Sequence, residues 1–291
     1  MQIQSNSISF QAGLTKQIRS EIASSNVKQI SDYISKNGIP NDFKENKLIA
    51  WCSLKCLEII KTLNKEYNLR LGLPKGIFVE DFKSLNISNQ QSAGVTNFAP
   101  CQLHLKNKTI FPEKTIFFNE FKGFNYSGGN EYWDRIDLTA DANYDDKISA
   151  TDFFMEIFFH EFAHAIHEEN LIKKLGGEKT VKAVKKSLRS DYTQHFRAKN
   201  KNLLNTICEY ASLNPFEAVA CDLSKRFIEN VNKNKLTIEQ NFISKSPYRK
   251  HNFFLLPFTK TETNPLSDLL RKCWNGKFET VSYTHLTLPT I

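Results

Sequence analysis

Two histidines and a glutamate stand close together in the segment 160–164, which reads His-Glu-Phe-Ala-His. Residues four apart on an α-helix share one face, with Cβ atoms about 5–6 Å apart, so His160 and His164 can reach one ion. Imidazole nitrogens bind Zn²⁺ at about 2.0–2.1 Å. Glu161 lies about 100° around the helix from His160, where its carboxylate can meet a metal-bound water. The segment therefore predicts a zinc site with Glu161 as its general base.

The residues around this segment predict a buried helix. The capping pattern at Ser149–Asp152 predicts its start, and Gly176-Gly177 predicts its end. Its first half is apolar on nearly every side, which indicates burial. Glu156, His160 and His164 form a polar line along it, and buried polar groups need partners. A metal ion would satisfy both histidines; a pair of hydrogen-bonded structural histidines is the alternative.

Two histidines leave a catalytic zinc site incomplete, because such a site takes three protein ligands and one water. The pattern H-E-x-x-H-x-x-G-x-x-H does not continue here, since its glycine position holds His167 and its last position holds Asn170. Three residues along one straight helix cannot converge on a tetrahedral ion. We therefore expect His167 to lie behind the ligands or to face solvent.

A glutamate from a later helix is the other source of a third ligand. Asn214 is a good N-cap and Pro215 a good first residue, so a helix should begin here with Glu217 in its first turn. The spacing Asn-x-x-Glu is also a capping arrangement, so Glu217 has a purely structural interpretation. The need for a third ligand favours the metal role, and Glu209 is the alternative ligand.

The segment 160–164 together with Tyr210-Ala211-x-x-Asn214-Pro215-x-Glu217 resembles the catalytic domains of anthrax lethal factor-like metallopeptidases, which are gluzincins. The resemblance covers about residues 150–225. It implies a zincin-like fold, with His160, His164 and Glu217 as zinc ligands and Glu161 as the base. It also implies that Tyr210 stabilises the oxyanion formed from the substrate carbonyl.

One position departs from the pattern of this family. The family usually has an acidic residue four positions after the ligand glutamate, where this chain has Cys221, followed by Asp222. Residues behind the ligands orient them and tune the metal, so the departure bears on activity more than on metal binding.

These residues predict a zinc-dependent endopeptidase that hydrolyses peptide bonds with a metal-bound water activated by Glu161. Its partner would be a protein or peptide substrate. A zinc-stabilised binding protein without catalysis is the alternative, motivated by Cys221 and by a basic stretch described below. An exported effector or toxin protease is a further alternative that concerns delivery and not chemistry.

The elements expected around the site define an α+β fold. Helices are expected at residues 14–36 and 42–67, strands at 76–79, 94–96 and 115–118, and mainly helices in the C-terminal half. A glycine-rich loop is expected at 125–130. The strand at 115–119 is a candidate sheet edge that could bind a substrate backbone.

We accordingly expect an N-terminal helical extension (residues 1–38) and a zincin-like catalytic domain with a small mixed sheet and an active-site helix (39–280). Residues 281–290, Val-Ser-Tyr-Thr-His-Leu-Thr-Leu-Pro-Thr, resemble the in-frame translation of a transposon-type sequencing adapter. Residues 281–291 are therefore expected to be a non-native tail.

Composition limits the location and partners of the chain. The first residues lack the basic and apolar regions of a secretory signal peptide, and no apolar cluster is long enough for a transmembrane segment. We expect a protein that is cytoplasmic, or exported without a Sec signal peptide, with its six cysteines as thiols. Residues 173–201 carry ten Lys or Arg against two acidic residues, which equals the net charge of +8. This stretch predicts a solvated face or attraction of an acidic partner, and no motif indicates nucleic-acid binding.

Overall fold

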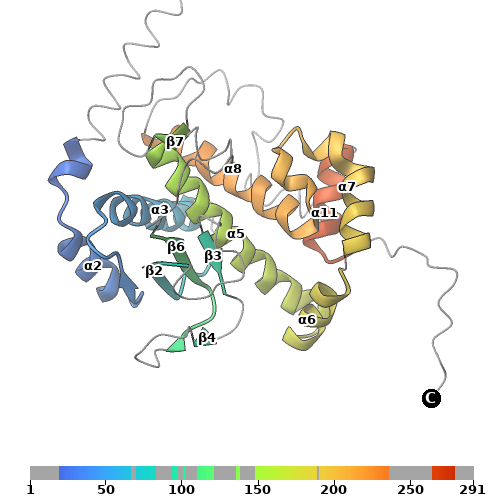
Figure 1. The fold of residues 1–291 in the computed structure, drawn as a ribbon, viewed down its shortest axis with the longest axis horizontal. Helices are drawn as coiled ribbons and strands as arrows, with labels where there is room; N and C mark the ends of the chain where they lie inside the picture. The colour runs from blue at the N-terminus through green and yellow to red at the C-terminus, as the bar shows by residue number, and fades with distance from the viewer. Residues whose placement is uncertain are drawn as a thin grey trace, which may run out of the picture. The chain divides into compact units, whose positions relative to one another are not determined.

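The computed structural model describes residues 20–66, 70–82, 94–97, 101–102, 110–120, 136–137, 148–188, 190–235 and 264–278 (Figure 1). The loop expected at 125–130, the tail 281–291 and the start of the first expected helix lie outside these ranges. By their contacts, the described residues form two units. The first contains residues 20–166 and 223–235, and the second contains residues 167–222 and 264–278.

The first unit is built on a mixed four-stranded sheet with the order β1–β2–β6–β3. β1 (Asn41–Asp42), β2 (Gly76–Glu80) and β6 (Thr115–Asn119) run parallel, and β3 (Gly94–Thr96) pairs antiparallel with β6. The expected α+β class with a small mixed sheet is therefore confirmed, and the strands expected at 76–79, 94–96 and 115–118 are present.

The position of β6 corrects one expectation. Phe117 of β6 is paired with Phe78 of β2 on one side and with Val95 of β3 on the other. The backbone groups of β6 are therefore used within the sheet, and β6 is not a free edge. The prediction that a substrate backbone could pair with residues 115–119 was wrong. Hydrophobic periodicity and composition identify a strand in the sequence, but they do not identify the strands beside it.

β6 is buried along its whole length, as expected for a strand covered on both faces. Its side chains alternate between the two faces. Phe117 packs with Phe78 and Phe111 in an aromatic cluster, with ring centroids 5.2 Å apart for Phe111 and Phe117. On the other face, the Phe118 ring lies 6.0 Å from the ring of Phe154 in the following helix. The sheet is thus fixed against that helix through β6.

The long helix α5 (Ala150–Leu175) carries the His-Glu-Phe-Ala-His segment. Its bounds match the expected start near Ser149 and the expected end before Gly176. Gly176 has a φ of 84°, and the N–H of Gly177 donates to the carbonyl of Ile172 at 3.0 Å. This left-handed cap satisfies a carbonyl of the last turn, which is why a glycine ends the helix here.

Two helices cover the N-terminal part of the first unit. A short helical segment at 20–24 precedes α2 (Val27–Lys36). Asn26 separates the two segments and caps α2, because its side chain accepts from the N–H of Gln29 at 3.0 Å. The second helix, α3 (Lys47–Glu66), begins five residues later than expected. Lys44 and Glu45 adopt positive φ, and Asn46 caps α3, so residues 41–46 form β1 and a turn.

The second unit is helical. It contains the end of α5, then α6 (Glu178–Ser187), α7 (Ser190–Leu204), a 3-10 turn η1 (Glu209–Ser212), the start of α8 (Pro215–Lys235) and α11 (Pro265–Trp274). The expected mainly helical C-terminal half is therefore present in this part of the chain.

Short strand pairs complete the described structure. β4 (Cys101–Gln102) pairs antiparallel with β5 (Ile110–Phe111), and β7 (Ile136–Asp137) pairs parallel with β8 (Ile148–Ser149). Among the helices described, none combines the length and the apolar character needed to cross a bilayer.

The contact between β3 and α5 leads to a prediction. A Cβ atom at Gly94 would overlap Cγ2 of Ile157 and lie 3.2 Å from Cγ of Glu161. We expect Gly94→Ala to lower the free energy of unfolding by about 1–3 kcal/mol, the usual cost of overpacking. Urea unfolding followed by circular dichroism measures the change. Gly72→Ala is the matched control, because Gly72 has no atom within 4 Å of the added Cβ; equal stability of the two variants would contradict the close packing of β3 on α5.

Candidate metal centre

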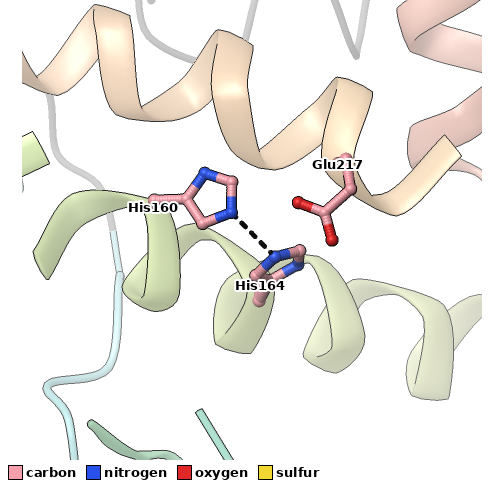
Figure 2. Close-up of side chains that lie close together, drawn as sticks. All are labelled: His160, His164 and Glu217. Atoms are coloured by element: carbon pink, nitrogen blue, oxygen red, sulfur yellow. Dashed lines mark hydrogen bonds between the residues drawn. The ribbon is translucent and has the colours of Figure 1, made fainter. Parts of the chain in front are cut away.

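His160 and His164 lie on consecutive turns of α5, and a nitrogen of each ring points toward the other ring (Figure 2). The two Nε2 atoms are 3.1 Å apart, and the ring planes are nearly perpendicular, at 88°. Two neutral imidazoles at this distance either share one proton or direct both lone pairs at a common cation. The helical spacing thus produces the convergence of nitrogens that the sequence predicts.

Glu217 reaches these histidines from the first turn of α8. Asn214 caps this helix, because its Oδ1 accepts from the N–H of Phe216 at 2.9 Å and from the N–H of Glu217 at 3.1 Å. The expected start of the helix at Pro215 is confirmed. The ligand atoms of His160, His164 and Glu217 all lie within 4.8 Å of one another, and each residue is half-buried. The structure therefore brings together the three residues that the motifs predict as metal ligands.

The helices α5 and α8 run through both units, and contacts within each unit hold them together. In the first unit, Phe227 of α8 stacks on Phe159 of α5, with centroids 4.6 Å apart and planes at 5°. In the second unit, the Phe216 ring lies 5.4 Å from the His167 ring of α5. The three candidate ligands lie between these two contacts on each helix.

The dimensions of the three-residue group suit a small divalent ion. Tetrahedral ligands placed about 2.0–2.2 Å from zinc lie about 3.3–3.6 Å apart. The separation of 3.1 Å between the two Nε2 atoms is close to this value. Even the upper bound of 4.8 Å would require a shift of only about 1.3 Å, which a side-chain rotation supplies. Two imidazoles and one carboxylate form a donor set that zinc accepts, so His160, His164 and Glu217 could hold this metal.

Phe216, the neighbour of Glu217, is held by three surrounding groups of the second unit. Besides the His167 ring, its ring lies 5.7 Å from the ring of Phe278 and 5.3 Å from Nζ of Lys185. Lys185 in turn donates to Oε2 of Glu168 on α5 at 3.2 Å. These contacts fix the first turn of α8, and therefore the backbone from which Glu217 extends.

The Lys185–Glu168 pair modifies one expectation for the basic stretch 173–201. Most of its described lysines, such as Lys173 and Lys182, are exposed. Lys185 instead points inward. Burial raises the pKa of the Glu168 carboxyl, although Lys185 opposes this, and burial lowers the pKa of the Lys185 ammonium group. Both shifts indicate charges removed from water, so this pair belongs to the packing of α6 on α5 and not to a solvated face.

Glu161 lies on the flank of α5 that faces the sheet. Its side chain is buried, and its backbone carbonyl accepts from Oγ1 of Thr96 in β3 at 3.1 Å. The close approach of Gly94 to Cγ of Glu161 places β3 next to this residue. The expected base therefore lies between the metal-facing side of α5 and the sheet.

The remaining residues implied by the family resemblance lie near the start of α8. Tyr210 lies in η1, directly before α8, and its side chain is 51% exposed. Cys221 and Asp222 follow Glu217 by about one turn and are both buried. Glu209, the alternative ligand, also lies in η1, and its side chain is outside the described part of the structure.

His167 was expected to lie behind the ligands or to face solvent, and the structure excludes the second alternative. Its side chain is only 1% exposed. Its Nε2 lies 3.1 Å from the carbonyl oxygen of Cys273 in α11, and since a carbonyl can only accept, Nε2 donates this hydrogen bond. The His167 ring also stacks on Trp274, with planes at 11°. Sequence reasoning missed α11 as a separate element, although Asn264-Pro265 carries the same N-cap signal as Asn214-Pro215.

Comparisons with known proteins give no further information about the site. No known family matches the chain, and neither a curated protein nor a solved structure matches it. The resemblance to lethal factor-like metallopeptidases therefore rests on the motif residues, and the roles of Glu161, Tyr210 and the three candidate ligands stay predictions.

The geometry predicts that Glu217 contributes to metal affinity. Loss of a group that merely supports a metal ligand lowers metal affinity by about 10–100-fold. We expect Glu217→Gln, which alters a ligand itself, to weaken Zn²⁺ binding by at least this much. Competition with a chromophoric zinc chelator measures the affinity. Glu178→Gln, at an exposed position on α6, removes the same charge and should leave the affinity unchanged. Unchanged affinity in Glu217→Gln would move the third ligand to Glu209 or elsewhere.

Proposed function

We propose that this chain is a zinc-dependent endopeptidase with a zincin-like catalytic domain, in which His160, His164 and Glu217 hold the metal. One observation carries the proposal: two imidazole nitrogens and a carboxylate oxygen lie within 4.8 Å of one another at the positions that two separate motifs predict. The buried Glu161 beside this group is the second support. The helix start at Pro215 places Glu217 in the first turn of α8.

The chemistry of the reaction is divided between the metal and the chain. When bound, zinc lowers the pKa of a water molecule to about 7 and polarises a carbonyl group. Glu161 takes the proton of the attacking water and later gives it to the leaving amine, as the carbon–nitrogen bond breaks. For this role the carboxylate must be held on one side of the helix, and Glu161 is buried where α5 meets β3.

A substrate backbone would lie along β3. Among the described strands, β3 pairs only with β6, so its other edge offers backbone N–H and C=O groups to an extended peptide. β3 is also the strand that contacts α5 at Glu161. This edge takes the role that was first assigned to residues 115–119.

Tyr210 would stabilise the charge that develops on the carbonyl oxygen. Preorganised hydrogen-bond donors at this oxygen usually provide the largest electrostatic contribution to such reactions. Its place in η1, five residues before Pro215, and its exposed side chain leave the hydroxyl accessible to a bound peptide.

A zinc-stabilised binding protein without catalysis is the second candidate. The observation that favours it is Cys221, which is buried one turn after Glu217 where the resembling family has an acidic residue. A carboxylate at this position would support the ligands; a protonated thiol donates only weakly. Zinc-loaded protein that cleaves no peptide in a broad library would favour this candidate.

The role of Glu161 can be tested directly. We expect Glu161→Gln to abolish hydrolysis of a peptide library, because a neutral amide cannot accept the proton of water. The zinc content should stay near one ion per chain, since Glu161 is not a ligand. Glu169→Gln on the same helix is the matched control and should retain activity. Full hydrolysis by Glu161→Gln, or loss of its zinc, would contradict the proposed roles.

A second prediction concerns Tyr210. Tyr210→Phe should lower kcat by about 10²–10³-fold, the usual cost of losing one oxyanion donor, with little change in KM. Steady-state kinetics on one cleaved peptide separates the two parameters. Tyr33→Phe is a suitable control, because Tyr33 is similarly exposed at 49% and lies in α2. A normal kcat in Tyr210→Phe would remove the hydroxyl from the mechanism.

A further inference from the structure

A groove in the second unit is lined by residues of α7 and α11 and by none of the candidate metal ligands. Figure 1 labels both helices. The groove is shallow: little of its roughly 400 Å³ is enclosed by the protein, and the rest is open to solvent. Residues four apart on each helix line it: Tyr192 and Phe196 on α7, and Leu269 and Cys273 on α11. Phe278 also lines it, and Phe196 and Cys273 are the buried residues of its floor. The lining is therefore mainly apolar, with two stacked rings, those of Tyr192 and Phe196, 6.3 Å apart.

The rim of this groove is basic. Lys199 on α7, Lys272 on α11 and Lys277 line it together with His195, and all four are exposed. No lining residue carries a carboxylate. Lys272 forms an ion pair with Asp268 at 3.1 Å, but both side chains are solvent-accessible, and such pairs contribute little. The groove thus combines an apolar floor with three positive charges at its mouth.

We propose that this groove docks an acidic peptide segment that also carries apolar side chains. Carboxylates of the segment would pair with Lys199, Lys272 and Lys277, and a leucine or phenylalanine would pack over the shallow apolar floor. Charges around an open groove raise the local concentration of an oppositely charged partner and its association rate. That the segment belongs to a protein substrate rests on the proposed function; the docking itself does not.

The shape of the groove favours a peptide over a small molecule. Sites for small ligands bury about 70–90% of the ligand, which requires an enclosed cavity. Here the volume opens to solvent along two helices, and the basic groups stand on the rim and not at the bottom. A chain segment can place one side chain on the floor while its charged neighbours remain at the mouth.

Peptide selection in the absence of metal tests the docking site independently of catalysis. A library of 12-residue peptides randomised over acidic, basic, apolar and small polar residues is selected on the Glu161→Gln protein in EDTA. We expect enrichment of peptides that combine Asp or Glu with Leu or Phe. Fluorescence anisotropy should show at least about tenfold weaker binding of these peptides to K199E/K272E/K277E, and weaker binding at high salt.

A matched charge reversal serves as the control. K173E/K174E/K179E makes the same change of charge at exposed positions outside the groove and should retain most of the affinity. Leu269→Ser should weaken binding without changing its salt dependence, because it alters only the apolar lining. Circular dichroism verifies that the variants are folded.

Three outcomes would overturn the proposal. The first is selection that enriches no peptide class, and the second is equal binding of the enriched peptides to both triple variants. The third is binding of phosphatidylserine vesicles or RNA through Lys199, Lys272 and Lys277 with no peptide enriched, which would assign the groove to a different polyanion. Failure of hydrolysis in the wild-type protein, with peptide docking intact, would instead contradict only the proposed function.

Discussion

The main constraint on the structure is that the buried helix α5 carries polar side chains, and each of them needs a partner. α5 is apolar on nearly all sides where it meets the sheet, yet it carries three histidines and four glutamates. A polar group taken from water must find a partner, and a charged one needs a stronger partner still. The elements that surround α5 supply these partners: α6 through Lys185, α11 through the Cys273 carbonyl, and α8 through Glu217.

These partners fall into two kinds, and the difference explains what each polar residue does. His167 donates from Nε2 to a backbone carbonyl and stacks on an indole, so its ring is held by fixed packing. His160 and His164 face each other across 3.1 Å with a carboxylate nearby, an arrangement in which nitrogen lone pairs and negative charge converge. Convergence of acceptors is unfavourable without a proton or a cation between them. The same helix therefore uses one histidine to hold the fold and, in our proposal, two to hold the metal.

The sequence predicts local features of this site well and distant ones poorly. The glycine cap at Gly176 and the Asn214 cap before Pro215 are set by short-range hydrogen bonds, so α5 and the start of α8 could be predicted to within a residue or two. The burial of His167 could not, because its acceptor is 106 residues away. The position of β6 between β2 and β3 was missed for a related reason. Strand order depends on pairing between distant segments, and the hydrophobic periodicity of one segment does not indicate its partners. α3 begins later than expected because Lys44 and Glu45 adopt left-handed backbone conformations, which their residue types do not signal.

The cysteines have a consequence for how the two units can be observed. Cys52 and Cys56 are fully buried in the first unit, where burial, with the neighbouring Cys52, raises the pKa of the Cys56 thiol, and Cys221 and Cys273 are buried in the second. All four are thiols and not disulfides. An exposed thiolate attacks an alkylating reagent, whereas a buried thiol does not, so each of these sulfurs reacts only when its surroundings open. Each unit therefore contains its own internal reporter of local unfolding, and the reaction rates of the two pairs would reveal whether the units open together or separately.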